Sequence, residues 1–324
     1  MTVSYVLNNP TRVHPDTRQR VLHVMRDLGY RPPLSRSTAD TVDDWRTTIG
    51  VIYSRWSRLT TEVFYYSHIV TGILQAADDQ GDHVTLYSHH TWTEDISRSL
   101  RRYCDGRCDG LILIAPRTDS ELLVTLRERG MPFVVAGDSG AGTDDACVDM
   151  DNETAAFQLT DYLLRLGHTR IAYLPGKSYV RATAERQAGW RAAHTMRGLP
   201  VFCEPVADGG WLPEYGYAQT TLLLDSGTPP TAILAINDTV AIGVMAALRD
   251  RGIRIGEQIS VAAFDDTPEA AHETPPLTSV AQPYSEIGAR AVALLTALLD
   301  GKPTERVLLP GVLKIRNSCG IPLP

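Results

Sequence analysis

Polar side chains follow two apolar segments of strand length in the last third of the chain. Asn237 comes directly after residues 232–236, and Asp265 comes directly after residues 259–264. In an open parallel sheet, ligands bind at the carboxyl ends of the strands, so an amide and a carboxylate placed there are candidate contacts for a small molecule. Asn is also among the best helix N-cap residues, so Asn237 can act as a cap, as a ligand contact, or as both.

The sequence gives little support for nucleotide binding or for covalent catalysis. Gly176, Lys177 and Ser178 resemble the end of a phosphate-binding loop, but Ile171 stands where that loop requires its first glycine. No Ser, Cys or Lys lies in a recognisable nucleophile context. We therefore expect a protein that is not an enzyme and that uses no cofactor.

Metal binding is also disfavoured. Asp265, Asp266, Glu269 and His272 lack the spacing of an oxygen-ligand site, which favours a surface acidic loop or a pair of hydrogen-bond acceptors. The five cysteines are scattered; Cys104 and Cys108 lie close together, but no second pair or nearby His completes a zinc set. Such cysteines are typical of reduced, buried thiols.

The elements that must position these groups alternate between strands and helices. A chain of 324 residues suggests about two domains. Apolar segments of strand length are predicted at 49–53, 83–87, 110–115, 132–137, 170–174 and 203–206, besides the two above. Helical patterns are predicted at 64–80, through Leu100, through Leu126, and at 153–166, 182–197, 215–224 and 239–252. Repeated units of this length predict parallel sheets covered on both faces, in two α/β lobes.

Composition and charge give the setting. No run of about 20 apolar residues exists, and the N-terminus lacks the plan of a secretory signal, so we expect a cytoplasmic protein without membrane contact. Residues 1–36 contain six Arg and two Asp, whereas the whole chain has a net charge of −7. A basic arm on an acidic body indicates a segment that faces phosphates. Within this arm, residues 16–28 read as a helix, and 31–46 read as a linker.

Several segments in order resemble the lactose/galactose-repressor family of bacterial transcription regulators. The effector-domain matches are LLRLGHTRIAYLPG, ERQAGWRAAHTMRGLP, AINDTVAIGVMAALRDRG, ISVAAFDD and PPLTSVAQPYSEIG. The segment TVSYVLNNPTRVHPDTRQRVLHVMRDLGYRP resembles the second half of the family's helix-turn-helix headpiece. This family shares its two-lobed fold with periplasmic sugar-binding proteins.

The resemblance implies an α/β fold with two side-by-side, doubly wound parallel-sheet lobes after a short helical partial headpiece. The implied domains are a headpiece at 1–30, a hinge at 31–46, a first lobe at 47–151 plus 283–307, and a second lobe at 152–282 plus 308–324. The chain would cross between the lobes near Asp151, Gln282 and Val307 and leave a cleft between them.

The resemblance also implies the residues that face this cleft. They are Asp138, Arg186, Trp211, Asn237, Asp265, Gln282 and Tyr284, with Tyr53, Trp56 and Phe64 as a further wall. Carboxylates and amides suit vicinal hydroxyls, Arg makes charge-assisted forks, and an aromatic face covers the apolar side of a sugar ring. The alternatives are core packing for each aromatic residue and an exposed helix position for Arg186.

The function so implied is that of an effector-responsive, homodimeric DNA-binding transcription regulator, a repressor, that senses a small carbohydrate or polyol. Effector binding would stabilise one arrangement of the lobes and thereby alter the contact of paired headpieces with operator DNA. One alternative is a sugar-binding module, or a regulator without specific DNA binding that acts through a protein partner. Another is a glycosidase using Asp138 and Asp265, which the clamp-like Arg186 and Asn237 disfavour.

The beginning of the chain departs from the family pattern. Met1 falls inside the second headpiece helix, which leaves Thr2, Ser4 and Tyr5 as the expected DNA contacts. We expect either that residues precede Met1 in the native protein or that specific DNA binding has been lost.

The hinge departs too. Pro33, Arg36 and Ala39 replace the family's Asn, Ala and minor-groove Leu. The nearby acidic residues Asp40, Asp43 and Asp44 would face phosphates. We therefore predict weak DNA contact by the chain as written.

Overall fold

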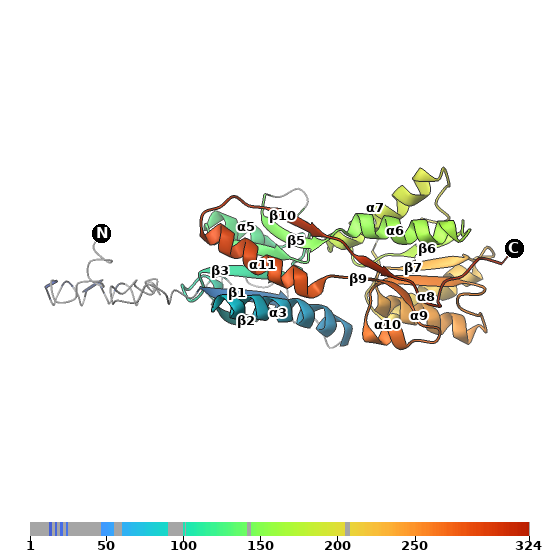
Figure 1. Cartoon of the computed structure of the whole chain (residues 1–324), viewed down its shortest axis with the longest axis horizontal. Coiled ribbons are helices and arrows are strands. Elements are labelled where there is room, and N and C mark those ends of the chain that lie inside the picture. The colour runs from blue at the N-terminus through green and yellow to red at the C-terminus, as the bar shows by residue number, and fades with distance from the viewer. Residues whose placement is uncertain are drawn as a thin grey trace.

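The computed structural model consists of two α/β lobes arranged along the long axis of the molecule (Figure 1). It describes residues 13–14, 17, 20–21, 24, 47–54, 60–89, 100, 102–140, 144–204 and 208–323. The described residues of the predicted helix at 16–28, which are Thr17, Arg20, Val21 and Val24, are helical. Thr2, Ser4 and Tyr5, the linker at 31–46, and Trp56 lie outside the described residues.

The first lobe is built on a six-stranded parallel sheet. Its strands are β1 (Thr48–Ser54), β2 (His83–His89), β3 (Gly110–Ile114), β4 (Phe133–Ala136), β5 (Ala146–Met150) and β10 (Arg306–Leu309). Their order is β10-β5-β4-β3-β1-β2. Because side chains alternate along a strand, Ile112 and Ile114 join the core beneath one layer of helices, and Leu111 and Leu113 join the core on the other face.

Helices cover both faces of this sheet. Helix α3 (Thr60–Gln80) packs against α11 (Tyr284–Leu299) on one face, and α5 (Glu121–Glu128) buries Leu122 and Leu126 on the other. Figure 1 shows α3 and α11 side by side, although more than 200 positions separate their starts along the chain. The covering on both faces explains why the strands read as continuous apolar runs.

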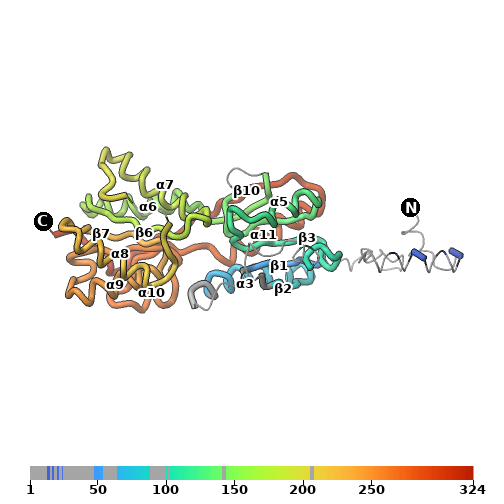
Figure 2. The backbone as a smooth tube through the Cα atoms, turned by 180° about the vertical axis from the view of Figure 1, so that it is seen from behind, coloured from blue at the N-terminus to red at the C-terminus, as the bar shows by residue number. Residues whose placement is uncertain are grey.

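The second lobe contains a five-stranded sheet. Its strands are β6 (Ile171–Leu174), β7 (Ala232–Ala235), β8 (Ser260–Asp265), β9 (Thr278–Ala281) and β11 (Val312–Lys314). The order is β11-β9-β8-β7-β6, with only β11 antiparallel to its neighbour among these strands. Two helix pairs flank this sheet, and α10 (Pro268–His272) follows β8 (Figure 2). The pairs are α6 (Asn152–Arg165) with α7 (Arg181–Met196), and α8 (Pro213–Asp225) with α9 (Asp238–Asp250).

A glycine sets the close approach of α6 and α7. A Cβ atom added to Gly189 would lie 2.1 Å from the carbonyl oxygen of Glu153. Real Cβ atoms do not come so close to a backbone oxygen, so the two helices pack at this distance only because residue 189 has no side chain. Gly189 lies one turn after Arg186 on α7, so this contact also sets the position of Arg186.

The chain passes between the two sheets three times: from β5 to α6, from β9 to α11, and from β10 to β11. Asp151 lies at the first crossing and Gln282 at the second, whereas Val307 lies within β10, just before the third. Figure 1 shows these segments running side by side between the lobes.

The structure corrects two expectations about strands. No strand was predicted between residues 137 and 153, but this segment contains the buried strand β5. The strand predicted at 203–206 is wrong for its described residues, because Cys203 lies in a bend and Glu204 is not in a strand. Glu204 instead pairs with Arg191 of α7, and β6 forms that edge of the sheet.

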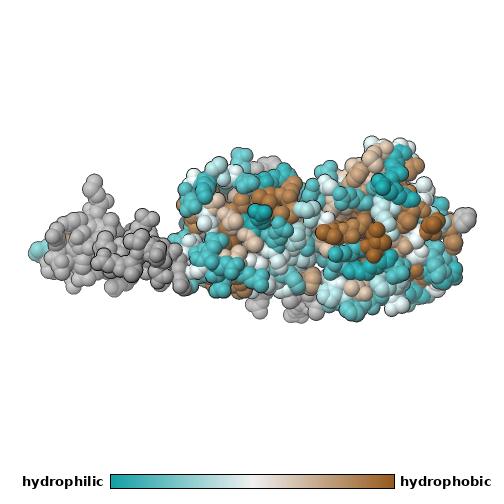
Figure 3. All heavy atoms as spheres, in the orientation of Figure 1, coloured by the Kyte–Doolittle hydropathy of each residue, from teal (hydrophilic) through white to brown (hydrophobic). Residues whose placement is uncertain are grey.

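The surface mixes hydrophilic and hydrophobic residues over both lobes, as the face drawn in Figure 3 shows. Within the described part of the chain, every helix is too short or too polar to pass through a lipid bilayer.

Candidate functional site

Arg186 is the central residue of the site. It is 4% exposed, which excludes an exposed helix position for it. Its Nε donates to Oδ1 of Asn152 at 2.9 Å, and its Nη1 donates to the carbonyl oxygen of Ile236 at 2.5 Å. The guanidinium carbon lies 4.2 Å from the centre of the Phe264 ring, within the range of a cation–π contact. These contacts fix the guanidinium at the carboxyl ends of β7 and β8.

Asp265 lies at the same edge of the sheet. Gln282 Nε2, from the second crossing segment, donates to Asp265 Oδ1 at 2.6 Å. Burial raises the pKa of Asp265, and the charge of Arg186 and the Gln282 hydrogen bond oppose that rise. The structure therefore brings together Arg186, Asp265 and Gln282, which lie far apart along the chain.

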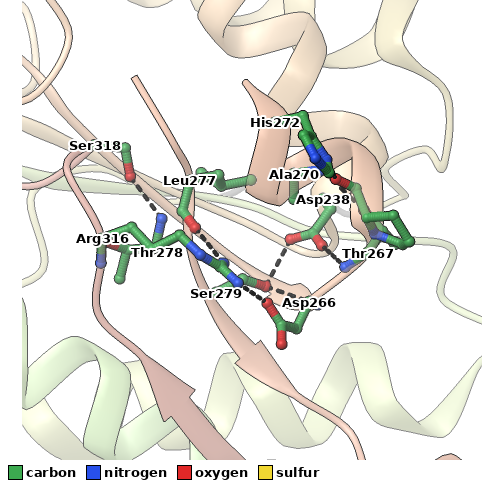
Figure 4. Close-up of polar contacts among 11 residues, drawn as sticks. Asp238, Asp266, Thr267, Ala270, His272, Leu277, Thr278, Ser279, Arg316 and Ser318 are labelled. Carbon is green, nitrogen blue, oxygen red and sulfur yellow. Dashed lines mark hydrogen bonds and ion pairs between the residues drawn. The ribbon is translucent and has the colours of Figure 1, made fainter. Parts of the chain in front are cut away.

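The backbone at Asp265 is strained and is held by its neighbours. Asp265 has φ of 114°, and Asp266 has φ of 54°. Non-glycine residues in this region cost on the order of 1–3 kcal/mol, so the surrounding contacts must stabilise it. Ser279 Oγ accepts a hydrogen bond from Asp266 N at 3.1 Å, and Arg316 Nη2 donates to Asp266 Oδ1 at 2.5 Å (Figure 4).

Asp238, at the start of α9, ties the same loop to the helix. Its Oδ1 accepts from Ser279 Oγ at 2.6 Å, and its Oδ2 accepts from Thr267 N at 2.7 Å (Figure 4). Its side chain is fully buried, and burial together with the charge of Asp265 raises its pKa. In the same loop, His272 Nδ1 donates to the Pro268 carbonyl oxygen at 2.7 Å.

Asn237 is the N-cap of α9. Its Oδ1 accepts from Val240 N at 2.9 Å, so the capping role is confirmed. Within the described part of the chain, its Nδ2 has no hydrogen-bond partner. The amide hydrogens thus stay available to a ligand while the oxygen caps the helix.

Asp138 lies after β4 of the first lobe but contacts α7 of the second. Arg181 Nε donates to Asp138 Oδ1 at 2.7 Å, and the next residue, Ser139, donates to Glu185. Thr118 adds a second connection, because its backbone N and its Oγ1 both donate to the Tyr179 carbonyl oxygen, at 3.1 and 3.2 Å. Asp138 is therefore a contact between the lobes.

Asp149 is a buried acid of this region that the sequence reading missed. It is 3% exposed on β5, and it accepts from Asn152 Nδ2 at 2.9 Å and from Met150 N at 2.7 Å. Burial raises its pKa to about 7; the charge of Glu185 adds to this rise, and the Met150 hydrogen bond and the charge of Arg186 oppose it. Asn152 joins Asp149 to Arg186, so the first crossing is in direct contact with the site. The signal in the sequence that could have identified Asp149 was an acidic residue within a short apolar strand.

Tyr284 lies in an aromatic cluster at the start of α11. Its ring centre is 5.7 Å from that of Phe64 and 5.5 Å from that of Tyr65, both in edge-to-face geometry. Tyr284 is 6% exposed, and its hydroxyl is buried without a hydrogen-bond partner among the described residues. Tyr65 was not predicted; a Cβ atom on Gly137 would lie 2.0 Å from its hydroxyl oxygen. Tyr53 is at the margin of this cluster, with its ring centre 6.2 Å from that of Tyr66.

Trp211 lies apart from the aromatic cluster. It is half-buried in the loop before α8, and a Cβ atom on Gly176 would lie 2.5 Å from its ring. It also packs against the core of the second lobe. Part of its surface therefore has the core-packing role that we gave as the alternative to a ligand contact. In the neighbouring loop, Lys177 Nζ pairs with Asp208 Oδ2 at 2.9 Å.

Comparison with known proteins identifies the family of the chain. Residues 1–33 match the model of the lacI family of bacterial regulatory proteins, and residues 160–319 match the periplasmic binding protein-like domain. The chain is 30% identical over 322 residues to the HTH-type transcriptional regulator CelR of Thermobifida fusca, covering 98% of this chain and 94% of CelR. It is also 30% identical over 321 residues to catabolite control protein A of Priestia megaterium, with the same two coverages.

Solved structures of the same kind superpose on this fold. A CelR–cellobiose complex gives a TM-score of 0.77 at 28% identity, covering 97% of this chain and 94% of that one. A lac repressor dimer bound to operator and the anti-inducer ONPF gives 0.75 at 28% identity, covering 98% and 94%. These relatives are transcription regulators and not enzymes. The chain therefore belongs to the lacI family of bacterial transcription regulators, whose members respond to small effectors.

Proposed function

We propose that this regulator senses a small carbohydrate or polyol held between its two lobes. The proposed contacts are Asp138, Arg186, Trp211, Asn237, Asp265, Gln282 and Tyr284, with Tyr53 and Phe64 on the side of the first lobe. The observation that carries the proposal is Arg186: its guanidinium is buried at the carboxyl ends of two strands of the second lobe, and its charge also acts on Asp149 and Tyr284 of the first lobe. Its Nη2 is engaged by no hydrogen bond within the described part of the chain.

The chemistry around Arg186 suits vicinal hydroxyls. Asn237 offers amide hydrogens, and Asp265 offers a carboxylate oxygen. The buried Tyr284 hydroxyl has no hydrogen-bond partner among the described residues, and a ligand would supply one. The aromatic rings of Tyr284 and Phe64 would cover an apolar ring face. That the relative CelR has been solved with cellobiose supports a sugar as the class of ligand.

We further propose that effector binding acts through the relative position of the lobes. The pairs Asp138–Arg181 and Thr118–Tyr179 join the lobes at the side of α7. A ligand that prefers one separation of the lobes shifts the population toward it by its difference in affinity. The division into lobes at 47–151 plus 283–307 and 152–282 plus 308–324 is part of this proposal.

The DNA end of the protein completes the proposal. Two copies of the chain would form a homodimer and place paired headpieces on operator half-sites, with Thr2, Ser4 and Tyr5 at the DNA. The match of residues 1–33 to the lacI family and the lac repressor dimer bound to operator support this arrangement.

Isothermal titration against a panel of sugars and polyols tests the site. We expect Arg186→Ala and Asp265→Ala each to weaken binding by about 10- to 100-fold, the range for a lost hydrogen bond to a charged group. Arg254→Ala and Asp79→Ala are matched controls, because both residues are exposed. Binding that neither site substitution changes would refute this placement of the effector.

A further inference from the structure

Three carboxylates near Arg186 have no cationic partner among the residues that the structure describes. Asp149 accepts only from Asn152 and Met150 N, Asp265 from Gln282, and Glu185 from Ser139. None of the three forms an ion pair within the described part of the chain. The two other acids nearby are already satisfied, since Asp138 pairs with Arg181, and Asp238 is bonded to Ser279 and Thr267.

Arg186 does not neutralise these acids by direct contact. Its Nε and Nη1 are bonded to two neutral oxygens, those of Asn152 and the Ile236 backbone. Arg306 acts on Glu185 only from the exposed strand β10, where water screens its charge. Arg181 also acts on Glu185, but its Nε is paired with Asp138. The region thus holds three acids that form no ion pair among the described residues.

Electrostatic effects relate these acids and the Tyr284 hydroxyl to Arg186 or to one another. The charges of Glu185 and Arg186 both act on Asp149, and that of Arg186 acts also on Asp265 and Tyr284. Glu185 Oε2 and the Tyr284 hydroxyl are both buried without a hydrogen-bond partner among the described residues, and Tyr284 is 6% exposed. An unpaired buried acceptor is costly, and several together indicate that a donor-rich group completes the site.

We propose that the effector carries a protonated amine on a hydroxylated frame, as an amino sugar does, with its ammonium group between Glu185 and Asp149. This inference rests on the proposed function and narrows its ligand class. An ammonium group has three donors and no acceptor, which matches carboxylate oxygens with no cation in contact. Arg186, Asn237 and Tyr284 then contact the hydroxyl groups.

The test compares matched ligands on the full chain by isothermal titration at neutral pH. Each neutral sugar or polyol is paired with its amine and with its N-acetyl derivative, which keeps the shape and removes the charge. We expect the amine to bind about 10- to 100-fold more tightly than either neutral partner, as for a charge-assisted hydrogen bond in a buried site. Glu185→Gln should reduce this preference at least about fivefold, whereas Glu128→Gln, an exposed carboxylate on α5, should leave it unchanged.

The outcomes separate this inference from the proposed function. If neutral ligands bind as tightly as their amines, the inference of an amine-bearing effector is overturned, and the proposed sugar or polyol site remains. Panels in which no member of either class binds overturn both. Stabilisation by Ca²⁺ alone, measured by thermal shift, would assign the acids to a metal instead. If Glu185→Gln lowers the folded fraction in circular dichroism, Asp149→Asn provides the second variant, with the same expected loss of preference for the amine.

Discussion

Replacing Asp149 by Asn tests whether a buried acid beside the first crossing lowers the stability of the fold at neutral pH. Asp149 is 3% exposed, and burial raises its pKa from 3.8 to about 7. A carboxyl whose pKa is raised in the folded state favours folding most when it is protonated. The folded state therefore loses stability as the pH rises from about 4, where the unfolded chain begins to ionise, to about 7.

The magnitude follows from the two pKa values. Each pH unit between them is worth about 1.4 kcal/mol, which gives a loss of about 4 kcal/mol by pH 8. At pH 5 the loss of stability is only about 1.5 kcal/mol, because most of the interval between the two pKa values lies above pH 5. Asn at this position keeps one acceptor and loses the other, facing Asn152 Nδ2 or Met150 N, at a cost of about 1 kcal/mol. Asp149→Asn should thus gain about 2–3 kcal/mol relative to wild type between pH 5 and pH 8.

Urea denaturation of the full chain, followed by circular dichroism from pH 5 to pH 8, measures this gain. Asp79→Asn, an exposed carboxylate on α3, is the matched control and should follow wild type at every pH. A constant difference between Asp149→Asn and wild type over this range would refute the reasoning, because it would mean that Asp149 does not ionise within it.

Three further predictions concern packing, the lobe contact and the hinge. Gly189→Ala should lower the free energy of unfolding, measured from urea midpoints, by about 1–3 kcal/mol, because the added Cβ meets Glu153 O. The control Ala188→Gly should lower it by only about 0.5–1 kcal/mol. A double-mutant cycle of Asp138→Ala and Arg181→Ala should give a coupling of about 0.5–3 kcal/mol in thermal unfolding; additive effects would mean that the pair does not join the lobes. Replacing Asp40, Asp43 and Asp44 by Asn should tighten DNA binding several-fold at low salt in a mobility-shift assay, with the gain lost at about 0.5 M salt. A nanomolar, sequence-specific complex of the unmodified chain at physiological salt would contradict the weak contact predicted from its hinge.

Much of the fold could be predicted from periodic apolar patterns. The helices at 64–80, 153–166, 182–197 and 215–224 lie within a few residues of α3, α6, α7 and α8, and the strands at 232–236 and 259–264 correspond to β7 and β8. These elements are buried on a face or on both faces, so their composition reflects their environment directly. Strand β5 was missed because it has only five residues, one of them Asp149, and its pairing with β4 and β10 compensates for its weak local signal.

The candidate site could be predicted in part. Arg186, Asp265 and Gln282 were expected together, and the structure brings them together. Asp149, Glu185 and Tyr65 were not expected, because each lies within a regular element whose pattern indicates only core or surface. Their role depends on which face of the element meets the other lobe.

By itself, the sequence determined the alternation of strands and helices, the polar groups at strand ends and the membership of the chain in its family, because each depends on local order along the chain. Only the tertiary structure decided that Arg186 donates to neutral oxygens and that, in the described part of the chain, three nearby carboxylates form no ion pair. The physical reason is that the cost of a buried charge depends on the atoms around it, and those atoms come from segments that folding brings together.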